Sequence, residues 1–185
     1  GAIGESAAWW MNPEFPPPLG GAAAIATLIK DERQKAKEED SYFLLIDAGD
    51  IWQGTPVGDK TKGQAVLKFF NKVKYDMWAL GNHDFDSGLE PVRQLVENSE
   101  MPVLCANLVD KSTGEMPEWD NLYPYLIKEY KGIEIGFIGV ITDDMPSLVT
   151  PAMRELVDFN KVGYTLLRLV KQLRLKGVDI IIVVS

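Results

Sequence analysis

Three polar side chains follow two apolar segments of the chain, each at the point where the segment ends. Asp50 comes after the apolar run at 42–46, and Asn82 and His83 come after the run at 77–80. Apolar runs of this length are typical of buried parallel strands, and open α/β sheets carry their chemistry just beyond the carboxyl ends of such strands. A carboxylate, a carboxamide and an imidazole delivered there together indicate chemistry on a hard metal ion.

Two of these residues have oxygen atoms that suit a metal. Gly49 allows a tight turn before Asp50, and a carboxylate in that position can bridge two cations about 3.5–4 Å apart, as in two-metal hydrolases. The alternative for Asp50 is a turn or helix N-cap, which is the common role of a loop aspartate. The amide oxygen of Asn82 is an acceptable ligand for a hard cation.

His83 is the only histidine of the chain, so these residues cannot build a site from several imidazoles. Its ring can hydrogen-bond an anion or donate a proton. Asp86 lies three residues further on, where it can fix the ring tautomer and raise its basicity, which would make a His–Asp dyad. The alternative is that Asp84 and Asp86 cap the helix that is expected to begin near Leu89.

Composition narrows the class of protein. The apolar fraction of 46% and charged fraction of 25% are those of a globular domain. A net charge of −8 argues against a nucleic-acid surface, which would need a basic stripe. It favours a metal site, because an acidic protein can hold a phosphate group among its carboxylates only if bound cations reverse the local field. The single cysteine, Cys105, excludes an internal disulfide and is expected to be a small buried hydrophobe. No apolar stretch is long enough to span a bilayer, and the start at Gly1 does not have the pattern of a signal peptide.

The order of apolar segments predicts an α/β fold with a largely parallel sheet and one antiparallel hairpin, which turns at Lys131-Gly132. Helices are expected from about 22 to 40 and over 64–73, 89–98 and 160–176. Strands are expected over 42–46, 77–80, 102–105, 125–130, 133–141 and 178–184. Because the chain stops directly after a buried strand, we expect residues 1–185 to be an incomplete domain.

Several other residues are expected to have structural roles. The proline-rich segment 1–20 is expected to be irregular, with Trp9, Trp10 and Phe15 packed in loops. Trp52, beside Asp50, is expected to shield the site from water. Asp143-Asp144 follows a strand and is interpreted as a helix cap.

Two sequence blocks resemble a known family. Gly-Asp-Ile-Trp-Gln-Gly at 49–54 and Gly-Asn-His-Asp-Phe-Asp at 81–86 are similar to the second and third blocks of the calcineurin-like metallophosphoesterases. They most resemble the branch of 5′-nucleotidases, UDP-sugar hydrolases and 2′,3′-cyclic-nucleotide phosphodiesterases, and the likeness continues through 104–108 and 138–144 to the last strand. The resemblance implies an α/β/β/α sandwich with mainly parallel central strands.

The resemblance also implies a role for each matching residue. Asp50 corresponds to the carboxylate that bridges two metal ions, and Asn82 to a ligand of the second metal. His83 and Asp86 correspond to the catalytic dyad, and Asn82 and His83 would contact the substrate. Asp84 occupies a position that is Asp or Glu in the family and is assigned no direct role. The implied cofactors are two divalent cations, and oxygen ligands mixed with imidazole suit Zn, Mn, Fe or Co.

The chain departs from the family pattern at both ends. No Asp-x-His motif occurs where the family opens, and the chain ends before a His and a Gly-His-x-His block that the family carries after the last strand. Residues 1–185 are therefore expected to be the N-terminal portion of a metallophosphoesterase domain, without the C-terminal substrate-specificity domain.

The resemblance predicts hydrolysis of phosphate esters of nucleotides or nucleotide sugars by the parent protein. It also implies a periplasmic or cell-surface location for the parent protein. The isolated 185-residue chain is expected to be nearly inactive. A degenerate domain kept for binding is the alternative outside the enzymes, and a sulfur-oxidation thiohydrolase is the alternative among them. The sequence does not decide the oligomeric state.

Overall fold

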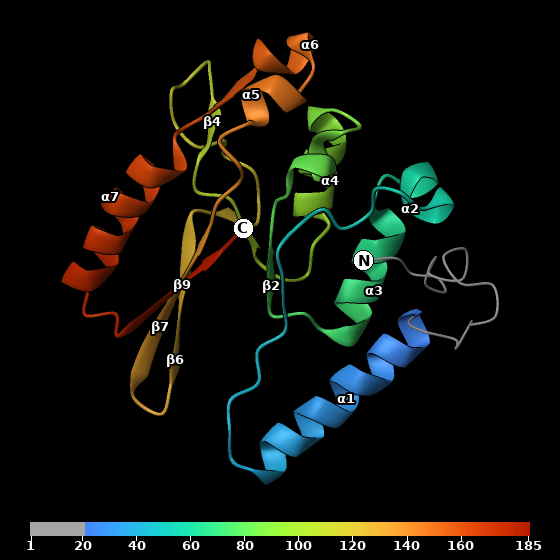
Figure 1. The fold of residues 1–185 in the computed structure, drawn as a ribbon, viewed down its shortest axis with the longest axis vertical. Helices are drawn as coiled ribbons and strands as arrows, with labels where there is room; N and C mark the ends of the chain where they lie inside the picture. The colour runs from blue at the N-terminus through green and yellow to red at the C-terminus, as the bar shows by residue number, and fades with distance from the viewer. Residues whose placement is uncertain (1–20) are drawn as a thin grey trace, which may run out of the picture.

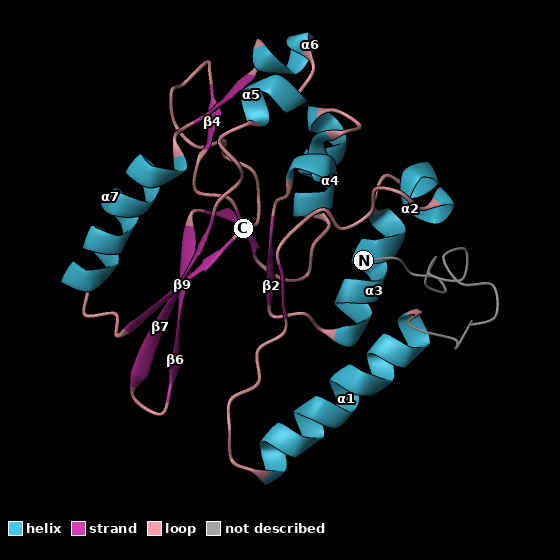
Figure 2. Ribbon diagram, in the orientation of Figure 1, coloured by secondary structure: helices cyan, strands magenta, loops and turns pink. Residues whose placement is uncertain are grey.

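The computed structural model describes residues 21–185, and the expectations for residues 1–20, including Trp9, Trp10 and Phe15, lie outside this part of the chain. Two β-sheets lie between helices on either side (Figure 1). Helices Gln64–Val73 (α3) and Leu89–Glu97 (α4) lie on the outer side of one sheet, and Val162–Leu175 (α7) lies on the outer side of the other (Figure 2). The α/β fold with a parallel-strand sheet is confirmed.

The first sheet is entirely parallel and has the strand order β1-β2-β3-β5. Its strands are short: Ile46–Asp47 (β1), Met77–Ala79 (β2), Val103–Leu104 (β3) and Leu122–Tyr123 (β5). Each is bounded by a turn or loop, and β1 and β2 are adjacent. This adjacency brings the two loops that carry the candidate site residues to one edge of the sheet.

The second sheet contains the expected hairpin. Strand Tyr125–Tyr130 (β6) pairs antiparallel with Ile133–Gly139 (β7), which pairs in parallel with Ile180–Val184 (β9). A separate antiparallel pair joins Leu108–Asp110 (β4) to Val157–Phe159 (β8). The hairpin turns at Lys131 and Gly132, both of which have positive φ.

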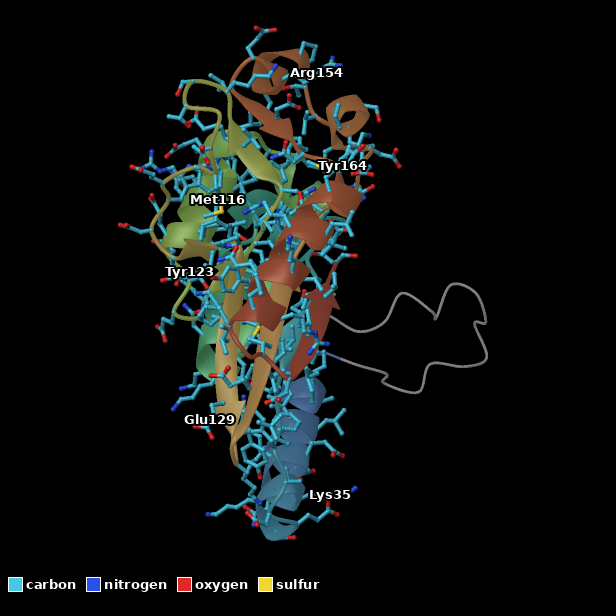
Figure 3. The ribbon with its side chains drawn as sticks, turned by 90° about the vertical axis from the view of Figure 1, so that its left-hand side faces the viewer. Lys35, Met116, Tyr123, Glu129, Arg154 and Tyr164 are labelled. Carbon is cyan, nitrogen blue, oxygen red and sulfur yellow. The ribbon has the colours of Figure 1, made fainter. Side chains whose placement is uncertain are left out.

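The four helices expected from the apolar periodicity are present, and within residues 21–185 the structure adds four short helices that the periodicity did not predict. Figure 3 shows Lys35 of α1 and Arg154 of α6 at opposite ends of the molecule. The helices are Ala22–Glu38 (α1), Pro56–Thr61 (α2), Gln64–Val73 (α3), Leu89–Glu97 (α4), Met145–Leu148 (α5), Pro151–Arg154 (α6) and Val162–Leu175 (α7), with a 3₁₀ helix at Asn82–Phe85 (η2). In α3, the buried residues Val66, Leu67 and Phe70 form one face, as the spacing predicts.

Successive side chains of β2 point to opposite faces of the first sheet and pack against the layer on each side. Met77 and Ala79 face the second sheet, where they pack in one cluster with Phe137 of β7. Trp78, between them, faces the opposite way, into the cluster that contains α3 and α4. Ile138 of β7 faces α7 in a third cluster. The structure is therefore a four-layer sandwich with three apolar interfaces.

Some sequence predictions are wrong in their bounds. The strand expected over 42–46 is reduced to Ile46–Asp47, because the Leu45 N–H donates to the carboxylate of Asp76 at 2.9 Å and Tyr42 stacks on Tyr130 with ring centroids 4.4 Å apart. Strands β4, β5 and β8 were not predicted, because two or three residues show no measurable periodicity. No helix among residues 21–185 is long and apolar enough to cross a membrane.

Cys105 is completely buried, as expected. Burial raises the pKa of its thiol to about 12, although backbone hydrogen bonds from Leu108 and Asn107 oppose that shift. The thiol is therefore neutral at physiological pH and serves as an apolar packing group.

The two sheets are in close contact at Gly139, and this contact gives a prediction. A Cβ at Gly139 would clash with the Cβ and carbonyl group of Leu104 on β3. We expect Gly139→Ala to lower the free energy of unfolding by about 1–3 kcal/mol, measured by urea denaturation. Gly163 of α7 is the matched control, because a Cβ there meets nothing within 4 Å and alanine favours a helix by about 0.5–1 kcal/mol. Equal effects of the two substitutions would contradict close packing between Gly139 and Leu104.

Candidate metal centre

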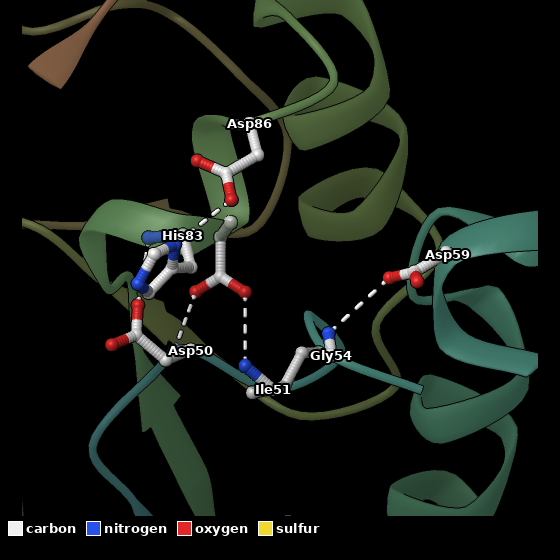
Figure 4. Close-up of polar contacts among 7 residues, drawn as sticks. Asp50, Ile51, Gly54, Asp59, His83 and Asp86 are labelled. Carbon is white, nitrogen blue, oxygen red and sulfur yellow. Dashed lines mark hydrogen bonds and ion pairs between the residues drawn. The ribbon is translucent and has the colours of Figure 1, made fainter. Parts of the chain in front are cut away.

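Two loops meet at the carboxyl edge of the first sheet. Strands β1 and β2 pair in parallel, with Ile46 opposite Met77 and Asp47 opposite Trp78. Because both strands end at the same edge, the segments 48–54 and 80–86 that follow them lie side by side (Figure 4). The structure thus brings together the two sequence blocks at 49–54 and 81–86.

Two glycines permit this close approach. Gly49 has φ 102°, and a Cβ on it would clash with the backbone of Gly81 and the carbonyl of Ala79. A Cβ on Gly81 would in turn clash with the backbone nitrogen and the carboxylate of Asp50. The two loops are therefore packed backbone to backbone, and a side chain at either glycine would push Asp50 away from β2.

Asp50 is held in an unusual conformation at this contact. Its φ of 56° is in the left-handed region, which non-glycine residues seldom adopt. Its Oδ1 accepts a hydrogen bond from the His83 backbone N–H at 2.8 Å, which directs the carboxylate toward the second loop (Figure 4). The residue is exposed, and within residues 21–185 its other carboxylate oxygen forms no hydrogen bond. That oxygen is free to bind a ligand.

Asn82, His83 and Asp86 lie at the start and end of η2. The His83 Nδ1 and the Asp86 Oδ2 are 2.8 Å apart, and the two side chains are 43% and 40% exposed. The hydrogen bond to Asp86 is the main cause that raises the pKa of His83, while desolvation lowers it. The ring nitrogen Nε2 is the one directed away from this bond, and it can act on a bound molecule.

Asp84 has a role that the sequence interpretation missed. Its side chain is completely buried, and its two oxygens accept hydrogen bonds from the N–H groups of Gly81 (2.8 Å), Ile51 (3.0 Å) and Asp50 (3.1 Å). Burial raises the pKa of Asp84 to about 7, against the lowering effect of these three bonds. The signal in the sequence was a carboxylate three residues after Gly81, the spacing of a side chain that bonds back to the start of a helix.

The alternative in which Asp84 and Asp86 cap α4, the helix that begins at Leu89, is wrong. The N-cap of α4 is Gly88, with no side-chain hydrogen bond. Asp84 instead bonds the two site loops, and Asp86 bonds the His83 ring. Asp144 occupies the N-cap position of α5, but its side chain forms no cap hydrogen bond there, so the interpretation of Asp143-Asp144 as a cap of the following helix is wrong in its bonds. The Oδ1 of Asp143 instead accepts the Val162 N–H at the start of α7 at 2.8 Å.

Trp52, which follows Asp50 by two residues, packs into the core. Its side chain is 5% exposed and contacts Gly63 at the start of α3. Within residues 21–185 its Nε1 has no hydrogen-bond partner. Trp52 therefore anchors the segment that follows Asp50, by burial of its large ring.

The electrostatics of the loops favour a cation. Burial raises the pKa of Asp47, and the nearby charge of Asp50 raises it further. Four acidic side chains, with His83 as their basic neighbour, occupy one edge of the sheet: Asp47, Asp50, Asp84 and Asp86. In addition to burial, the charge of Asp50 raises the pKa of both Asp47 and Asp84, and a divalent ion bound to Asp50 would relieve this repulsion.

The donors that could hold a metal are an oxygen of Asp50 and the amide oxygen of Asn82. Both suit hard or borderline divalent ions, and both follow strand ends on adjacent strands. Residues 21–185 contain no group of three or more His, Cys, Asp or Glu side chains that could hold a metal. The two donors fit part of a coordination sphere.

Comparison with known proteins identifies the family. The Calcineurin-like phosphoesterase family matches residues 18–185, which include both site loops. The chain belongs to this family. It is 37% identical over 139 residues to a 5′-nucleotidase of Vibrio parahaemolyticus, covering 75% of the chain and 24% of the relative. It is 27% identical over 191 residues to the cell wall protein Lmo0130 of Listeria monocytogenes, covering 91% and 24%. The chain thus spans about a quarter of the length of these relatives.

Solved structures share the fold. The NAD nucleotidase NadN of Haemophilus influenzae superposes with a TM-score of 0.75 at 28% identity, covering 90% of the chain and 28% of that structure. The sulfate thiohydrolase SoxB of Thermus thermophilus superposes with a TM-score of 0.81 at 23% identity, covering 90% and 30%. At that identity the likeness to SoxB shows the fold alone. The resemblance to the family and to its 5′-nucleotidase branch is confirmed.

The hydrogen bond between His83 and Asp86 gives a pH prediction for the metal-free protein. Because Asp86 stabilises the charged ring, Asp86→Asn should lower the pKa of His83 toward 6.5. In the unaltered protein, the stabilisation from charged His83 is fully present below pH 6.5 and is lost as pH rises through the higher folded-state pKa. An NMR titration of the ring Cε1–H, unambiguous because the chain has one histidine, measures the shift. An unchanged midpoint would show that the ring and carboxylate do not interact.

Proposed function

We propose that the protein containing this chain is a metal-dependent phosphoric ester hydrolase that acts on nucleotides. The observation that carries the proposal is the juxtaposition, at one sheet edge, of the carboxylate of Asp50 with η2, which bears Asn82 and the His83–Asp86 pair. Membership of the Calcineurin-like phosphoesterases and relatives named 5′-nucleotidase support the nucleotide as substrate class. The partner is therefore a small molecule, a nucleotide or nucleotide sugar.

Asp50 and Asn82 are the residues that would hold the metal ions. Two divalent cations, when bound, act as Lewis acids that activate water and neutralise charge on the phosphoryl oxygens. Asp50 offers its free oxygen while its other oxygen remains fixed by the His83 N–H, so the carboxylate does not need to rotate on binding. The amide oxygen of Asn82 adds a neutral ligand next to it. Zn, Mn, Fe and Co all suit such a mixed donor set.

His83 would act on the substrate. The bond from Nδ1 to Asp86 fixes the ring orientation and leaves Nε2 to meet the phosphoryl group or the leaving oxygen. A raised pKa keeps a larger fraction of the ring protonated near neutral pH, and a protonated ring can donate to the leaving oxygen. Asp86 is thus the orienting partner, and Asn82 and His83 are the substrate contacts.

Two further features belong to this proposal, and one alternative remains. Residues 1–185 would form the N-terminal portion of the catalytic domain, and the remaining metal ligands and the substrate-specificity domain would lie elsewhere in the parent protein. A periplasmic or cell-surface location is supported by the name of the Listeria relative, a cell wall protein. A degenerate domain kept for binding would be indicated if the tests below find no metal-dependent turnover.

Metal-dependent release of phosphate from AMP tests the proposal on the full-length protein. We expect turnover with added Mn²⁺ or Zn²⁺, and loss of turnover after chelation. Asp50→Asn should abolish metal-dependent turnover, and His83→Gln should lower kcat by about 10²–10⁴-fold with metal still bound. Asp110→Asn is the matched control, because among residues 21–185 the carboxylate of Asp110, at the end of β4, accepts side-chain hydrogen bonds only from Ser112. Absence of metal-dependent turnover by the unaltered protein would defeat the proposal.

The isolated chain of residues 1–185 should be nearly inactive. The reason is that residues 21–185 supply two metal ligands, while a catalytic site with two ions needs several more. The same AMP assay, run at equal protein concentration on the isolated chain and on the full-length protein, measures the difference. Comparable turnover by the two would show that Asp50 and Asn82, with water, are sufficient.

A further inference from the structure

Asp84 links the two loops on which the proposed metal ligands lie. One loop contributes the N–H groups of Asp50 and Ile51 (Figure 4), and the other contributes the N–H of Gly81. We call these three hydrogen bonds the Asp84 bridge. They are formed by a side chain with no solvent exposure, so no water competes for its oxygens.

The bridge is well placed to fix the distance between Asp50 and Asn82. Asp50 is itself a donor to Asp84, and Gly81, the third donor, immediately precedes Asn82. Asp50 also has a left-handed φ of 56°, a conformation that persists only when its surroundings enforce it. The contact between Gly49 and Gly81 sets how close the loops can come, and attraction to one shared carboxylate keeps them there.

We propose that Asp84 is a positioning residue, which holds Asp50 and Asn82 in the arrangement that binds metal without itself contacting metal or substrate. This inference rests on the function proposed above. A carboxylate is required, because each of its oxygens must accept from a backbone N–H and an amide NH₂ in the same place would face a donor. Outer hydrogen-bond partners of this kind typically affect metal affinity by about 10- to 100-fold.

Amide hydrogen exchange on the unaltered, metal-free protein is the first test. We expect the amides of Asp50, Ile51 and Gly81 to be protected, although they lie in loops. Exchange of all three at the rate of exposed loop amides would overturn the proposal. This measurement needs no metal and no substitution, so its result is independent of whether the protein is a hydrolase.

The second test is Asp84→Asn in the full-length protein. We expect faster exchange at those three amides and a Kd for Mn²⁺, measured by electron paramagnetic resonance, that is about 10- to 100-fold higher. Unchanged Mn²⁺ affinity in the folded variant would overturn the positioning role. Failure of the unaltered protein to bind Mn²⁺ would instead count against the proposed function, while the exchange data still decide whether the bridge exists.

Asn107→Asp is the matched control, since it is the reverse isosteric change at another completely buried polar residue. Asn107 bonds the backbone of Ile141 and Asn160 and neither site loop. We expect it to lower the thermal stability of the fold and to leave Mn²⁺ affinity and the three amides unchanged. Equal loss of Mn²⁺ affinity in both variants would show that Asp84 matters only through general stability.

Discussion

The parallel pairing of β1 with β2 is the constraint on which the proposed site depends. It aligns the ends of two strands, and the loops beyond them can then come into contact only if neither carries a side chain at the meeting point. Gly49 and Gly81 satisfy that condition. Once the backbones touch, the His83 N–H can reach the carboxylate of Asp50, and the local geometry of the site follows from main-chain contacts.

Buried and exposed ionisable side chains lie together at this edge of the sheet. Asp84 is deeply buried and accepts three N–H bonds, and Asp47 is partly buried, so desolvation acts on both. Asp50 and the His83–Asp86 pair are more exposed and keep groups available for a ligand. Buried carboxylates therefore organise the backbone, and the more accessible groups are left for chemistry.

Elements that are set by local apolar periodicity could be predicted from the sequence. Features that depend on contacts between residues distant in sequence could not. The apolar spacing located α3 and β6 at their observed bounds and placed the hairpin turn, because each is set by local periodicity and a glycine-containing turn, but it extended β7 two residues beyond its end at Gly139. It misjudged β1, since the length of that strand depends on Asp76, which is distant in sequence. Asp50, Asn82, His83 and Asp86 could be selected by residue type. The role of Asp84 could not, because its partners lie on two loops more than thirty residues apart.

The state of Cys105 has a practical consequence for spectroscopy. Its thiol is completely enclosed and neutral, so maleimide and methanethiosulfonate reagents have neither access to the sulfur nor a thiolate to attack them. A second cysteine introduced on the molecular surface would react alone. Spin or fluorescent labels could then be attached to single chosen positions of this chain with its native cysteine left in place.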